Sequence, residues 1–74
     1  MYKHLFEMYD ESVSPSRLID RNEMTDVSPI PINPGYVVPT KDGMRYRVTR
    51  IDRPTSEGYD THIIAYCVPE LPLN

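Results

Sequence analysis

The sequence has one cysteine, no long apolar run and few residues that bind metals. The lone thiol, Cys67, has no second cysteine with which to form an intramolecular disulfide, which is typical of a reducing compartment. No stretch approaches the roughly 20 apolar residues of a membrane-spanning helix. The charged segment 1–11 also lacks the apolar run of a signal peptide. We therefore predict a cytoplasmic protein that has no membrane partner.

Histidine and cysteine are too few for a structural zinc site. Such a site takes four ligands of these two types, and the chain offers only His4, His62 and Cys67. Because His62 and Cys67 have opposite parity within one predicted strand, their side chains point to opposite faces. A cysteine in an apolar strand is typically a small buried hydrophobe rather than a nucleophile. The sequence predicts no metal and no other cofactor.

Acidic residues gather around one predicted loop, which includes Asp52, Glu57 and Asp60. Carboxylates can act as general acids and bases, but charged loop residues are usually only solvated. A chain of 74 residues also has little room for a pocket that excludes water. No catalytic motif stands out, and we predict that the protein is not an enzyme.

The size and charge of the chain indicate one small domain over residues 1–74. Its hydrophobic content is only 39%, but six tyrosines and one phenylalanine add large apolar area. The net charge of −3 disfavours a general nucleic-acid binder, which is normally basic. Residues 41–53 depart from this balance, with five basic against two acidic side chains. Because small domains often gain stability by self-association, a homo-oligomer is one expected arrangement.

The clearest predicted strand lies in this basic segment, KDGMRYRVTRIDR over residues 41–53. Asp42-Gly43 predicts a hairpin turn that leads into the strand. Apolar residues then alternate with arginines, as in a strand that is buried on one face. The alternation slips after Val48, and a β-bulge at Thr49-Arg50 would restore it.

Two further strands flank this one in the sequence. Pro34-Gly35 has the central residues of a type II turn and leads into a short strand over residues 36–38. The four prolines of residues 27–39 exclude a helix there, and residues 28–32 are expected to be extended along a sheet edge. Residues 61–68, THIIAYCV, form a strand with two largely apolar faces. That strand is either central and covered on both sides or open to a partner on one face.

The first third of the chain carries weaker signals. The apolar side chains of residues 2–9 fit both a helical and a strand period, and their Tyr and Phe content favours a strand. Residues 15–24 are predicted as a short helix, because Ser14-Pro15 suits the cap and the first helical position. Leu18 and Ile19 are the only apolar anchors of that helix, so a loosely packed loop is the alternative.

Together these elements predict a mainly β fold, a small antiparallel β-barrel or β-sandwich with a short helical segment near residues 15–24. Hairpins dominate this prediction, because no connection after residue 27 has the length of a helical crossover. Residues 70–74, ELPLN, are expected to form a loose tail.

The order of these signals resembles that of SH3-like small β-barrels. A Pro-Gly turn, a short strand, the run GMRYRV over residues 43–48 and a hairpin to an apolar strand carry the resemblance. Within that group the chain is similar to the short β-proteins of phages and prophages, over about residues 28–70. The resemblance implies a compact binding module that acts on a host protein, and it carries over no catalytic residue.

The arginines of the basic strand form the candidate binding surface. Arg45 and Arg47 share one strand face and Arg50 and Arg53 lie beyond them, while Tyr46 is predicted as an aromatic contact. Such a row suits an acidic protein surface or phosphates. The alternative is a solvated face that discourages edge-to-edge aggregation. Phosphates are the less favoured ligand, because nothing compensates the net charge of −3.

From these features we predict a non-catalytic protein–protein binding module, of the kind that a phage encodes to modulate or inhibit a host protein complex in the host cytoplasm. A nucleic-acid-binding small β-barrel and a homo-oligomeric structural protein are the alternatives. Nucleic-acid binding would fall steeply with salt, whereas a protein interface centred on apolar residues would be far less salt-sensitive.

Overall fold

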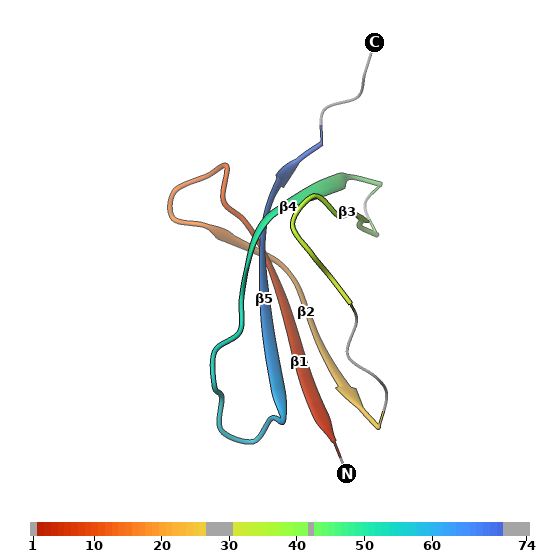
Figure 1. Cartoon of the computed structure of the whole chain (residues 1–74). Helices are drawn as coiled ribbons and strands as arrows, with labels where there is room; N and C mark the ends of the chain where they lie inside the picture. The colour runs from red at the N-terminus through yellow and green to blue at the C-terminus, as the bar shows by residue number, and fades with distance from the viewer. Residues whose placement is uncertain (1, 27–30, 42, 71–74) are drawn as a thin grey trace.

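The computed structural model describes residues 2–26, 31–41 and 43–70. These residues form five strands and no helix, so they also contain no helix long and apolar enough to cross a membrane. The strands are β1 (Lys3–Asp10), β2 (Arg17–Thr25), β3 (Val37–Pro39), β4 (Arg45–Asp52) and β5 (Thr61–Pro69) (Figure 1). The prediction of a mainly β fold is confirmed.

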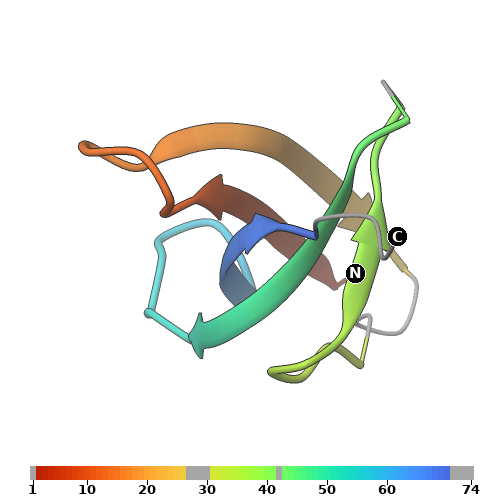
Figure 2. The same cartoon turned by 90° about the horizontal axis from the view of Figure 1, so that it is seen from above.

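All five strands belong to one sheet in the order β2-β1-β5-β4-β3. The sheet curls into a half-barrel, with β2 and β3 at its two edges (Figure 2). Three of the four pairings are antiparallel, but β1 and β5 run parallel. A single curled sheet is consistent with the predicted small β-barrel and differs from a two-sheet sandwich. The parallel pair arises because β5 returns to the sheet beside the first strand of the chain.

The prediction of a short helix over residues 15–24 is wrong, because residues 17–25 are the edge strand β2. β2 pairs antiparallel with β1, from Lys3 opposite Thr25 to Asp10 opposite Arg17. Backbone groups that a helix would pair internally are paired with β1 instead. The two apolar anchors of the proposed helix could bury too little surface to compete with this pairing.

The N-terminal segment is a strand, as predicted, and it occupies the middle of the sheet. Phe6 and Met8 point into the core, whereas Glu7 and Tyr9 point to the opposite face. We call these two sides of the sheet the core face and the outer face.

The predicted β-bulge in β4 is also confirmed. The register between β4 and β5 shifts between Val48 and Arg50, with Val48 opposite Cys67 and Arg50 opposite Tyr66. The extra residue returns Arg50 to the outer face, while the next residue, Ile51, packs against the core.

The turns follow their sequence signals where the structure describes them. The Tyr36 N–H donates to the Asn33 carbonyl at 3.1 Å, and Gly35 has φ 92°, as the predicted type II turn requires. In the second turn Gly43 has φ 84°, while Asp42 lies outside the described residues. The predicted extended edge near residues 28–32 is described only from residue 31, and the predicted tail only at residue 70.

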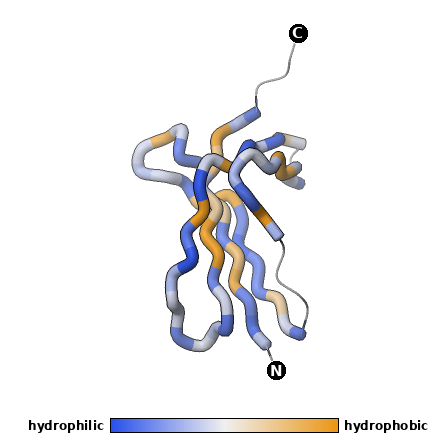
Figure 3. Tube along the Cα trace, in the orientation of Figure 1, coloured by the Kyte–Doolittle hydropathy of each residue, from blue (hydrophilic) through white to orange (hydrophobic). Residues whose placement is uncertain are grey.

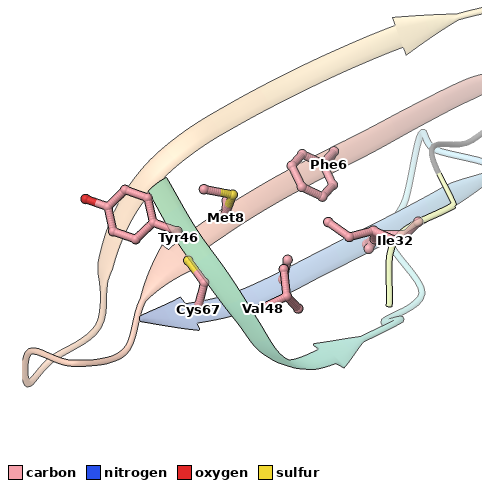
Figure 4. Packing of buried hydrophobic residues seen from close by; sticks show 8 residues of the cluster. Phe6, Met8, Ile32, Tyr46, Val48 and Cys67 are labelled. Atoms are coloured by element: carbon pink, nitrogen blue, oxygen red, sulfur yellow. The ribbon is translucent and has the colours of Figure 1, made fainter. Parts of the chain in front are cut away.

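The core lies inside the curl of the sheet. Apolar residues concentrate in the middle strands, as the hydropathy colouring shows (Figure 3). The buried cluster consists of Phe6, Met8, Ile32, Tyr46, Val48, Ile63, Ala65 and Cys67 (Figure 4). Ile32 comes from the segment before β3 and is 2% exposed, so this Pro-rich connection contributes to the core as well as linking two strands.

Candidate protein-binding surface

The predicted arginine row lies along the outer face of β4. Arg45 and Arg47 alternate with the buried Tyr46 and Val48, and both arginines are exposed. Tyr46 is only 2% exposed and packs in the core, so it is not part of the outer face. The outer face of β4 therefore carries Arg45, Arg47 and Arg50, while Arg53 follows the end of the strand and Tyr46 is in the core.

Arg47 is held by a carboxylate from the end of β5. Its Nε donates to Glu70 Oε2 at 2.8 Å and its Nη2 donates to Oε1 at 2.5 Å, which is a two-pronged contact. The hydrogen bond with Glu70 raises the pKa of Arg47 above its ordinary value. The backbone N–H of Glu70 also donates to the Arg45 carbonyl at 2.8 Å. Arg47 is thus ordered and its charge is compensated within the chain.

Arg50 lies over an aromatic pair. Its guanidinium carbon is 3.7 Å from the centre of the Tyr66 ring, within the range of a cation–π contact. Tyr66 stacks on Tyr9 of β1, with ring centres 5.9 Å apart and planes inclined by 26°. Glu11 accepts from Arg50 Nε at 3.4 Å and also from the Thr49 hydroxyl. We call Tyr9, Tyr66 and Arg50 the Arg–Tyr stack.

The stack is continuous with apolar side chains on the same face. Ile64 and Val68 lie on the outer face of β5 and are half-buried, as are both tyrosines of the stack. Leu18, opposite Tyr9, is 46% exposed. The strand over residues 61–68 is therefore central in the sheet, with one face covered by the core and the other only partly covered.

Arg45 and Arg53 make no ion pair or side-chain hydrogen bond with any of the residues that the structure describes. They lie at opposite ends of β4, which separates them by roughly 25 Å of extended strand. The four arginines therefore do not converge on one point. The two in the middle are paired with carboxylates, and the two at the ends are available.

A hydrogen-bonded chain that the sequence did not reveal joins Ser56, His62 and Glu7. Ser56 Oγ is 2.5 Å from His62 Nδ1, and His62 Nε2 is 2.5 Å from Glu7 Oε1. The histidine and glutamate side chains are only 10% and 14% exposed. The alternation of strand side chains correctly predicted that His62 lies on the face opposite Cys67. Its partners Ser56 and Glu7, however, are 6 and 55 positions away in the sequence. Only the pairing of β1 with β5 brings them together.

These three residue types also form the triad of serine hydrolases. Here their hydrogen bonds hold the β4–β5 connection against the outer face. A cavity of about 260 Å³ lies beside them, and Arg53, Ser56 and His62 are among its lining residues. The same connection reaches β2, because Tyr59 donates to Glu23 and accepts from Arg21 at 3.3 Å. The hydrogen bond with Glu23 raises the pKa of the Tyr59 hydroxyl.

The predicted acidic loop residues do not form a cluster. Asp60 Oδ2 accepts from the Lys3 backbone N–H at 2.7 Å, which fastens the start of β5 to β1. Within the described ranges no group of three or more His, Cys, Asp or Glu side chains is arranged to hold a metal ion. His4 instead bonds the Thr61 hydroxyl through Nδ1 at 2.7 Å.

No family model, curated protein or solved structure matches this chain. The outer face of β4 and β5 offers an ordered cation on an aromatic pair and adjacent half-buried aliphatic groups. Unpaired arginines lie at the start of β4, Arg45, and just after its end, Arg53. This set of groups suits contact with another protein more than chemistry on a small molecule.

Proposed function

We propose that this domain is a non-catalytic protein-binding module that contacts its partner through the outer face of β4 and β5. The Arg–Tyr stack is the observation that carries the proposal. Arginine and tyrosine are enriched among the residues that contribute most to binding at protein interfaces. In this domain the Arg50 and Tyr66 side chains are already ordered, because Glu11 holds Arg50 over the Tyr66 ring. An ordered side chain loses less conformational entropy on binding.

The charges of this surface favour a protein over a nucleic acid as the partner. Arg47 and Arg50 already bond Glu70 and Glu11, so neither is a free cation for a phosphate. Release of counterions from phosphates, which drives most nucleic-acid binding, would therefore gain little from them. The partner that fits has an apolar centre to cover Ile64 and Val68, with acidic groups that reach the free arginines.

As part of the same proposal, the module is an SH3-like small barrel that a phage encodes to modulate or inhibit a host protein complex in the host cytoplasm. Its support is the small curled sheet and the resemblance of residues 28–70 to such proteins. The single cysteine, buried in the core, suits a reducing compartment.

The test is affinity capture from bacterial lysate, with and without nuclease, using wild type and two charge-reversal variants. Arg50→Glu removes the stack, while Arg17→Glu is the matched control on β2, where the side chain is 67% exposed and 3.9 Å from Asp10. We expect one stoichiometric protein to survive nuclease, to bind Arg17→Glu normally and to bind Arg50→Glu at least about 30-fold more weakly.

Thermal melts of both variants show whether each remains folded. Capture that disappears with nuclease would replace the proposal with nucleic-acid binding. Equal capture by the folded Arg50→Glu variant would show that the partner binds elsewhere on the molecule.

A further inference from the structure

β2 is an edge strand whose second side has no partner in the described part of the chain. Its nine residues pair with β1 alone. Figure 2 shows β2 along one rim of the curled sheet, and β1 is its only hydrogen-bonded neighbour among the described strands. Seven of the nine residues are exposed. The unpaired N–H and C=O groups of such an edge form a template for a further strand.

We propose that β2 pairs with the β2 strand of a second copy of this chain, antiparallel and about a two-fold axis at Asn22. An axis perpendicular to the sheet leaves every side chain on its own face, so residues that lie opposite one another must share a face. With the axis at Asn22, Arg21 of each copy lies opposite Glu23 of the other, on the outer face. Opposite charges in directly opposed positions stabilise an antiparallel pair.

The neighbouring registers are electrostatically unfavourable. An axis at Arg21 opposes two arginines, an axis at Glu23 opposes two glutamates, and an axis at Asp20 opposes two aspartates. Only Asn22 puts a neutral residue on the axis among these four positions. Among these four positions, the charges of β2 therefore favour the axis at Asn22.

The two charged side chains are positioned for this contact. Within one chain Arg21 Nη1 is 3.2 Å from Glu23 Oε1, and Tyr59 bonds both residues from the outer face. Arg21 is nevertheless 46% exposed and Glu23 55% exposed. A guanidinium has five donors and a carboxylate about four acceptor sites, so each side chain can take a second partner. This inference does not depend on the protein-binding surface, which lies on β4 and β5.

A charge-exchange experiment tests the pairing. Self-association is measured by sedimentation velocity over a concentration series for wild type, Arg21→Glu, Glu23→Arg and the double exchange. Each single variant should self-associate at least about tenfold more weakly than wild type, because two like-charge contacts replace two ion pairs. The double exchange should restore the dimer. An equimolar mixture of the two single variants should form a heterodimer, because every opposed pair in it has opposite charges.

The mixture distinguishes a contact between two copies from an effect within one chain. Each single variant has lost its own Arg21–Glu23 ion pair, so only contacts between copies can restore association when the two are mixed. Arg45→Glu is the control for net charge and should leave self-association unchanged. The proposal would be overturned if wild type stays monomeric at every concentration, or if the two single variants do not associate when mixed. The β2 charges would then serve to prevent edge-to-edge pairing.

A cross-link tests the register independently. In Asn22→Cys the two new thiols meet at the axis, within the Cα separation that a disulfide spans. In the control Thr25→Cys the two thiols are roughly 20 Å apart. We expect covalent dimer on mild oxidation of the first variant alone. Equal cross-linking of both variants, or none in the first, would overturn the register.

Discussion

β2 and β5 are both nine residues long, but the sheet uses them in opposite ways. β5 lies between β1 and β4 and buries Ile63, Ala65 and Cys67 in the core. β2 pairs on one side only, and Ile19 and Met24 alone pack against the core from it. The side chains of β5 thus determine its place in the fold, whereas β2 is held mainly through its backbone. Substitutions at matched positions in the two strands should therefore differ in cost.

The largest difference is expected for removal of an aliphatic side chain. Ile63→Ala leaves a cavity in the core and should lower the free energy of unfolding by about 2–5 kcal/mol. Leu18→Ala on β2, where the leucine is 46% exposed, should cost less than about 1 kcal/mol. Urea denaturation of both variants measures the two values. Similar costs at the two positions would show that β2 packs more tightly than its exposure indicates.

The next difference concerns thiol reactivity. Cys67 is fully buried, and burial, followed by the charges of Asp10 and Glu11, raises the pKa of its thiol to about 11 from 9.0. The two-unit difference lowers its thiolate fraction about 100-fold near pH 8, and burial slows the reaction further. A thiol placed on the edge strand by Thr25→Cys should react with an aromatic disulfide reagent at least about 100-fold faster.

The reaction is followed with the folded protein and again in denaturant, where Cys67 should react at the rate of a free thiol. Because the folded state keeps a proton that the unfolded state releases, stability should also fall as the pH rises from about 9 to about 11. A rapid reaction of Cys67 in the folded protein would mean that the core opens frequently at β5.

The smallest difference is expected for single carboxylates. Glu7→Gln weakens a largely buried charged acceptor that bonds His62 at 2.5 Å and Tyr9 at 3.3 Å, and should cost about 1 kcal/mol. Asp20→Asn on β2 changes an exposed carboxylate and should stay within about 0.5 kcal/mol. Thermal melts at pH 7 compare the two. If the two variants melt at the same temperature, the Glu7–His62 hydrogen bond does not stabilise the β4–β5 connection.

Strong local patterns predicted the middle of the sheet correctly. Alternation identified β4, and its slip after Val48 located the bulge that places Arg50 on the outer face. The apolar run over residues 61–68 identified β5, because β-branched and aromatic residues suit a buried strand. The same patterns failed for residues 17–25, where a cap-like Ser-Pro start and a mixed polar sequence indicated a helix. An edge strand needs few apolar side chains, so its sequence shows little alternation to recognise.

The candidate surface was predicted only in part. The sequence identified the arginines, and parity placed Arg45 and Arg47 on one face. It did not reveal that Arg50 lies on Tyr66, because that contact depends on the register between β4 and β5 across the bulge. The pairing of Arg47 with Glu70 likewise depends on which strand lies beside β4.

Local sequence was enough to show which residues favour strands, where two turns lie and which arginines share a face. These properties depend on side-chain shape, on backbone preference and on the two-residue period of a strand, all of which act over a few neighbours. Three features emerge only from the assembled fold: β1 runs parallel to β5, residues 17–25 form an edge, and Ser56, His62 and Glu7 meet. Those outcomes depend on contacts between distant residues, whose free energy exists only once the whole sheet is assembled.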